Sequence, residues 1–187
     1  MNDASEQTRR VFIALWPDDA TRRQLAQTAD TLEGPGRRVP PAHLHLTLAF
    51  PGTVATERVD CLTAGLDRLQ TRPFRLILDR LGYFAAARVT WVGPSRPPDR
   101  LQGLAERAKA LCEDCGIALE ARPFVPHVTL RRGSQNLPDD AVSVEPIDWR
   151  VTTVALVESG NNGHPGVYRV LARTGPENAP DPIRRAD

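Results

Sequence analysis

The sequence predicts an α+β protein of two similar lobes that face each other across a cleft. Three observations support this fold class. Strand-like and helix-like segments alternate along the chain, the order strand, helix, strand occurs twice, and the strand that closes each order carries a histidine and a threonine two residues apart. The intervals from Val11 to His45 and from Val89 to His127 are 34 and 38 residues. We interpret this self-similarity as an internal duplication.

Composition places the chain among ordinary globular proteins. Of its 187 residues, 41% are hydrophobic and 25% are charged, which suits one domain or two small lobes that share a core. The formal net charge is +1, so no overall basic field indicates a nucleic-acid binder, and an anionic partner must be held locally. The N-terminus is polar, and no apolar run is long enough to span a membrane. We expect a soluble, cytoplasmic monomer.

In the first half, apolar alternation predicts strands, helical periodicity predicts helices, and proline and glycine mark the breaks. Residues 1–9 are polar and are expected to form a flexible N-terminus. The predicted elements are a strand from Arg10 to Trp16, a helix capped by Asp18 or Asp19, a strand from Ala42 to Phe50, a turn at Pro51-Gly52, a helix that begins at Thr53 or Thr56, a strand over Phe74–Leu78, and a turn at residues 81–84.

The second half follows the same order and then diverges. Its predicted elements are a strand from Arg88 to Val92, a helix that carries Leu101 to Cys112, a short strand at 117–121, a strand from Phe124 to Arg131, a loop at 133–146, and strands at 150–157 and 168–172. The pseudo-repeats cover about residues 10–84 and 88–174 of one bilobal domain. Residues 175–187 have three prolines and no apolar periodicity, which predicts a disordered tail.

The two histidine–threonine segments alternate as half-buried strands do. In the first, Leu44, Leu46, Leu48 and Phe50 share the side expected to face the core, and His43, His45, Thr47 and Ala49 share the other. In the second, His127 and Thr129 share one side. A lone pair of this kind is weak evidence, but two pairs in matching surroundings indicate a site between the lobes.

Two histidines can divide acid–base work, because a neutral imidazole accepts a proton from water while an imidazolium donates one to a leaving oxygen. The hydroxyls of Thr47 and Thr129 would hydrogen-bond the oxygens of a tetrahedral anion held between His45 and His127. This is machinery for cleaving a phosphodiester without a metal or a cofactor. No carboxylate shares these strands, which argues against a metal site of the usual histidine and carboxylate kind.

Several other residues are candidates for the rim of the site. His43 lies on the face of His45 but has no counterpart, since Val125 takes the equivalent place, so we expect a substrate contact. By alternation Arg131 shares the face of His127 and is favoured as a phosphate contact, although Arg132 is also a candidate. Tyr83 and Phe84 are candidates for stacking on a base.

Other conspicuous residues are expected to be structural. Trp91 and Trp149 are assigned to the core, and His164 is assigned to a surface loop. Three cysteines, Cys61, Cys112 and Cys115, cannot pair completely, and Cys112 and Cys115 lack a second ligand pair for zinc. We interpret the pair at 112 and 115 as helix-face thiols in a reducing cytoplasm.

The paired motifs His45-Leu46-Thr47-Leu48 and His127-Val128-Thr129-Leu130 resemble those of the 2H phosphoesterase superfamily, and within it the RNA 2′,3′-cyclic phosphodiesterases, also called 2′-5′ RNA ligases. The resemblance covers about residues 10–173. It implies a bilobal α+β fold in which two antiparallel sheets line a central cleft, with helices packed outside. The implied reaction is metal-independent hydrolysis of a terminal 2′,3′-cyclic phosphate to a 2′-phosphate.

The resemblance also implies roles. His45 would be the proton donor to the departing 3′ oxygen, and His127 the acceptor of the proton of water. The chain departs from the family at His43, where asparagine is frequent. The arginine of the family falls on Arg132, whereas alternation favours Arg131; a bulge or a strand end would reconcile the two.

Three alternatives to this substrate and activity remain. The substrate could be a small nucleotide, such as an ADP-ribose cyclic phosphate or a 2′-5′ oligoadenylate, instead of an RNA end. The enzyme could act in the direction of 2′-5′ ligation. The chain could also be an RNA-end binding module without turnover, although binding alone does not need two groups that exchange protons.

Overall fold

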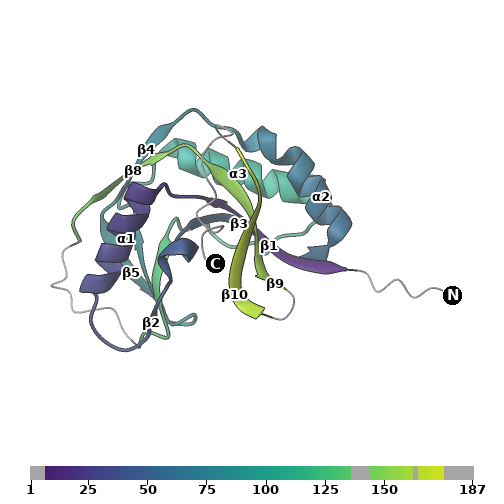
Figure 1. The fold of residues 1–187 in the computed structure, drawn as a ribbon. Coiled ribbons are helices and arrows are strands. Elements are labelled where there is room, and N and C mark those ends of the chain that lie inside the picture. The colour runs from purple at the N-terminus through teal and green to yellow at the C-terminus, as the bar shows by residue number, and fades with distance from the viewer. Residues whose placement is uncertain (1–6, 136–143, 162–163, 175–187) are drawn as a thin grey trace.

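The frame of the molecule is an eight-stranded antiparallel sheet (Figure 1). The computed structural model describes residues 7–135, 144–161 and 164–174. The strand order is β10 (His164–Arg173), β9 (Val154–Asn161), β1 (Thr8–Leu15), β3 (Leu46–Ala55), β7 (Val128–Arg132), β6 (Val89–Gly93) and β5 (Arg80–Phe84), with β2 (Arg37–Arg38) paired to β7. A second antiparallel sheet pairs β4 (Phe74–Leu78) with β8 (Ile147–Val151).

Three α-helices cover the sheet in the described part of the chain: α1 (Asp19–Thr31), α2 (Thr56–Gly65) and α3 (Asp99–Asp114). Asp18 caps α1 by accepting a hydrogen bond from the Thr21 amide at 2.8 Å. Figure 1 shows α2 and α3 side by side, and both contact β3. Short 3₁₀ helices, η1 (Pro41–His43) and η2 (Leu66–Leu69), precede β3 and follow α2.

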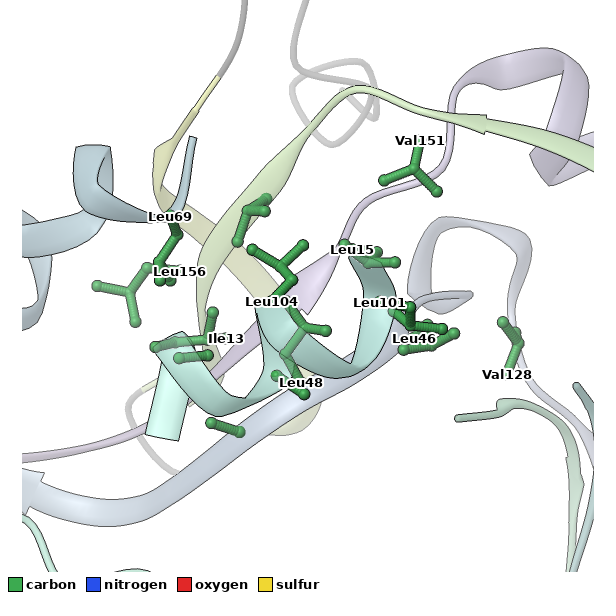
Figure 2. Close-up of a cluster of buried hydrophobic side chains, with 14 of the residues drawn as sticks. Ile13, Leu15, Leu46, Leu48, Leu69, Leu101, Leu104, Val128, Val151 and Leu156 are labelled. Carbon is green, nitrogen blue, oxygen red and sulfur yellow. The ribbon is translucent and has the colours of Figure 1, made fainter. Parts of the chain in front are cut away.

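The main core lies between the sheet and these helices. Ile13, Leu15, Leu46 and Leu48 from the central strands pack with Leu104 of α3, all buried (Figure 2). The apolar stripe of each helix and the alternate residues of each strand supply this cluster. Hydrophobic burial of this stripe therefore explains why the helices lie on one face of the sheet.

The two sequence halves pair at the middle of the two motifs. β3 and β7 pair where Leu46 lies opposite Val128, the residue between histidine and threonine in each motif. Because the strands are antiparallel, His45 lies alongside Thr129, and Thr47 lies alongside His127. Leu46 and Val128 are fully buried. The four polar side chains therefore project from the opposite face of the sheet, around a local pseudo-twofold axis.

The predicted α+β class with two antiparallel sheets is confirmed, and three details differ. The strands that line the cleft all belong to the eight-stranded sheet, whereas β4 and β8 lie apart from it. Strand pairing joins the two sequence halves, since β5 pairs with β6 and β9 pairs with β1. The first strand begins at Thr8, so Thr8 and Arg9 do not belong to the expected flexible N-terminus; Arg9 pairs with Glu158 at 2.8 Å.

Two predicted turns are wrong, and each is part of a strand. Pro51-Gly52 lies within β3, where a register shift between Val11 and Ile13 of β1 accommodates an extra residue. Gly52 has a φ of 77°, which a residue with a side chain rarely adopts. Residues 81–84 form most of β5. The predicted strand at 117–121 is absent, because the Ile117 amide bonds back to Cys112 at the end of α3.

The other predicted segments differ less from the structure. The strand predicted at 150–157 is divided between β8 and β9, and residues 136–143 of the predicted loop and the predicted tail at 175–187 lie outside the described residues. Trp91 and Trp149 are buried as expected. His164 is the first residue of β10, but its side chain lies outside the described part, so its surface assignment stays a prediction.

The thiol interpretation of the cysteines is wrong for Cys115. It forms a disulfide with Cys61, 54 residues away, and this bond joins α2 to the C-terminal end of α3. Cys112 is free and buried. Packing of α2 against α3 brings Cys61 and Cys115 together, which local spacing does not indicate. No described helix is long and apolar enough to cross a membrane.

Candidate active site

A cleft of about 1240 Å³ crosses the face of the sheet opposite the helices, and all four motif side chains line it. His45 and Thr47 come from the start of β3, and His127 and Thr129 come from the start of β7. Each histidine immediately precedes its strand, while the next residue is anchored in the core. The local alternation of buried and exposed positions therefore holds both pairs toward the same space.

Both imidazoles are held by the backbone in the same way. Nδ1 of His45 donates to the carbonyl oxygen of His43 at 2.6 Å, and Nδ1 of His127 donates to that of Val125 at 2.7 Å. A carbonyl can only accept, so each neutral ring carries its proton on Nδ1 and leaves the Nε2 lone pair available. The duplicated bond fixes the orientation and the tautomer of both rings.

Burial disfavours the charged form of both histidines. Burial lowers the pKa of His45 to about 4, helped by the charge of Arg132, although the bond to the His43 carbonyl opposes the shift. Burial and Arg132 also lower the pKa of His127, against its bond to Val125. An anion in the cleft would oppose these effects, because a neighbouring negative charge favours the imidazolium. Protonation and anion binding are therefore coupled.

Aromatic rings hold the first histidine in place. Phe12 of β1 stacks on His45 with centroids 4.5 Å apart, and Tyr168 of β10 meets the same ring edge-on at 5.5 Å. Neither Phe12 nor Tyr168 was predicted from the sequence to be a site residue. Their alternation on β1 and β10 shows only that they face one side of the sheet, and β10 reaches His45 because of the tertiary pairing with β9.

The two arginines after the second motif have different positions. Arg132 lines the cleft, whereas Arg131 donates to the carbonyls of Leu32, Gly34 and Gly36, the last two at 2.7 and 2.9 Å. The alternation that favoured Arg131 is wrong, because the pairing of β6 and β7 shifts register between Thr90 and Trp91. This bulge reverses the faces of the residues that follow Leu130.

Of the three remaining predicted site residues, one lines the cleft and two do not. Phe84 lines the cleft and meets the His127 ring edge-on at 4.9 Å. Tyr83 does not line it, and its hydroxyl donates to the Ser134 carbonyl at 3.0 Å. His43 also lies outside the lining; its ring packs on Tyr168 at 4.3 Å, and its carbonyl orients His45. Neither side chain lines the cleft, and the expected substrate contacts at Tyr83 and His43 stay predictions.

The cleft has further basic and aromatic lining that sequence reasoning did not assign, including Arg10, Phe50 and Arg122. Nothing local distinguishes Arg10 and Arg122 from surface positions, and the alternation that assigned Phe50 to the core is wrong, because this side chain is 47% exposed. Within the described ranges, no three histidine, cysteine, aspartate or glutamate side chains gather where they could hold a metal ion. The groups present can donate and accept protons and can bind an anion.

Two histidine–threonine pairs in one cleft of an antiparallel sheet are typical of the 2H phosphoesterases. A model of the 2′-5′ RNA ligase superfamily matches residues 16–163, and the chain belongs to that superfamily. It is 34% identical to the RNA 2′,3′-cyclic phosphodiesterase of Escherichia coli over 73% of this chain and 77% of that protein. It is also 34% identical to the RNA 2′,3′-cyclic phosphodiesterase of Thermus thermophilus over 88% of both chains.

Solved structures agree with this assignment. The crystal structure of E. coli LigT complexed with 3′-AMP aligns with a TM-score of 0.77 and 31% identity, covering 90% of this chain and 98% of that chain. LigT complexed with phosphate aligns with a TM-score of 0.73 and 29% identity over 90% and 97%. The family resemblance inferred from the motifs is confirmed, and with it the expectation of an enzyme of the phosphodiesterase class.

Proposed function

We propose that the chain hydrolyses RNA ends that carry a 2′,3′-cyclic phosphate, giving 2′-phosphomonoesters. One observation carries the proposal: two imidazoles with free Nε2 atoms line one cleft with two threonine hydroxyls and Arg132. These groups can bind a phosphate monoanion and exchange protons on two sides of it. The names of the curated relatives support the same reaction.

In the proposed step, water attacks phosphorus opposite the bond to the 3′ oxygen. Nε2 of neutral His127 takes a proton from water, and protonated His45 gives a proton to the 3′ oxygen as its bond to phosphorus breaks. Thr47, Thr129 and Arg132 bind the non-bridging oxygens. Burial, and to a smaller extent the charge of Arg132, lower the pKa of His45, and the negative charge of a bound phosphate would favour the protonated form that the acid role needs.

The test is to incubate the protein with 2′,3′-cyclic AMP and with short RNAs that end in a cyclic phosphate, and to resolve the products by phosphorus NMR. We expect 2′-phosphates, formed at the same rate with and without EDTA. A predominantly 3′-phosphate product would mean that the sugar binds in the opposite direction and that the acid and base roles are exchanged. No turnover of any cyclic phosphate would refute the proposal.

A further inference from the structure

Phe50 has an unusual position for a large aromatic residue. The strand alternation of Leu44, Leu46 and Leu48 assigns Phe50 to the core, yet its exposed fraction is 47% and it lines the cleft. Ala49 is buried in its place. The register shift between β1 and β3, where Ile13 pairs with Ala49 and Val11 with Gly52, causes this reversal. Bulges beside active sites commonly re-aim a side chain in this way.

Arg10 covers one face of the exposed ring. Its guanidinium carbon lies 5.1 Å from the Phe50 ring centroid. Among the described residues, no acidic side chain pairs with Arg10, so its charge is available to a ligand in the cleft. The other face of the ring is the one left for stacking. A planar guanidinium and an aromatic ring are the groups on which unpaired bases stack.

The place of Phe50 along β3 indicates which base it would meet. It follows Thr47 by three residues, a span of roughly 10 Å at the rise of an extended strand. Phe84 lies against the His127 ring and so is nearer to the reacting phosphate. The cleft volume of about 1240 Å³ exceeds the roughly 300–1,000 Å³ of an ordinary small-molecule site. There is room for more than the terminal nucleotide.

We infer that Phe50 and Arg10 form a subsite for the unpaired base of the penultimate nucleotide of an RNA end. The inference rests on the proposed function, and it makes the enzyme selective for oligonucleotide ends over cyclic mononucleotides. A chain that ends in a 2′,3′-cyclic phosphate continues only on its 5′ side, so the next base in that direction is the one the subsite receives.

The experiment compares kcat/KM for 2′,3′-cyclic AMP with that for the dinucleotide ApA ending in a 2′,3′-cyclic phosphate. We expect the wild-type protein to prefer the dinucleotide. Phe50→Leu should reduce this preference by about 5- to 100-fold, as the loss of one base–aromatic stack does. Phe50→Tyr keeps the ring and should retain the preference. Val167→Ala is the control, because Val167 is also 47% exposed but does not line the cleft.

The possible outcomes separate the subsite from the reaction. If Phe50→Leu lowers kcat/KM equally for both substrates, Phe50 serves the terminal nucleotide and the inference is wrong. If it changes neither, the ring binds no base. In both cases the wild-type protein still hydrolyses cyclic phosphates, so the proposed function stands. If the wild-type protein hydrolyses neither substrate, the proposed function and the subsite are both refuted.

Discussion

Arg131 and Arg132 are adjacent in sequence and identical in chemistry, so they form a matched pair for testing the site. Arg132→Gln removes a charge from the cleft and should lower kcat/KM by about 10- to 100-fold, the effect of one lost charge-assisted hydrogen bond. Arg131→Gln leaves the carbonyls of Leu32, Gly34 and Gly36 without their donor. It should reduce the free energy of unfolding by about 1–3 kcal/mol and leave kcat nearly unchanged.

Steady-state kinetics and urea unfolding of both variants are the measurements. The opposite pattern, with loss of turnover in Arg131→Gln and loss of stability in Arg132→Gln, would contradict the assignment of the bulge in β7.

The two histidines should act as one unit. His45→Ala and His127→Ala should each reduce kcat severely, and the double variant should be little worse than either, because one step needs both proton transfers. Thr47→Ala and Thr129→Ala should each cost about 2–4 kcal/mol of transition-state stabilisation, like the loss of an oxyanion donor. Single-turnover kinetics with a cyclic phosphate measure these effects. Near-normal turnover in either histidine variant would remove that residue from the mechanism.

The disulfide between α2 and the end of α3 should matter for stability and not for chemistry. Cys61 and Cys115 lie on the helix side of the sheet and do not line the cleft. Cys61→Ser with Cys115→Ser should lower the free energy of unfolding by about 2–4 kcal/mol, because the bond closes a long loop in the unfolded chain.

The measurement is urea unfolding of the oxidised protein and of the double variant, with kcat determined at a temperature where both are folded. Cys112→Ser is the control for loss of a sulfur without loss of the bond. Equal stability of the oxidised protein and the double variant would show that the bond does not stabilise the native state.

The free energy of unfolding of the whole protein should depend on pH through the buried histidines. His45, His43 and His127 all have a folded pKa below the ordinary value of 6.5. The unfolded chain therefore binds protons at a higher pH than the folded protein does. The stability that neutral rings contribute is complete above about pH 6.5 and is lost as the pH falls toward 4.

We expect the urea midpoint to fall between pH 6.5 and 5, and His45→Gln to flatten this slope. This pH interval lies above the range in which Asp79, Asp148 and Glu158 titrate. Their pKa values are lowered in the folded protein, so the stability that their charged forms contribute is lost only at more acidic pH. Phosphate should shift the wild-type curve, because an anion in the cleft favours the charged rings. If His45→Gln leaves the slope of the urea midpoint against pH unchanged, protonation of His45 does not cause the pH dependence.

Most elements of the fold and the four motif residues that line the cleft could be predicted from the sequence. Alternation and helical periodicity indicated most strands and all three described α-helices, because burial of one face imposes those periods on the sequence. The same alternation assigned His45, Thr47, His127 and Thr129 to the face away from the core, and they line the cleft. The repeated motif also identified the family.

The surroundings of these four residues depend on contacts between distant elements, which local patterns do not show. Bulges in β3 and β7 reverse the faces of Phe50, Arg131 and Arg132, and a one-residue shift in pairing leaves no mark in a local pattern. Tyr168 reaches His45 through the pairing of distant strands, and Cys61 reaches Cys115 through the packing of distant helices. Periodicity records which side of an element is buried, but contacts between distant elements depend on how their surfaces pack together.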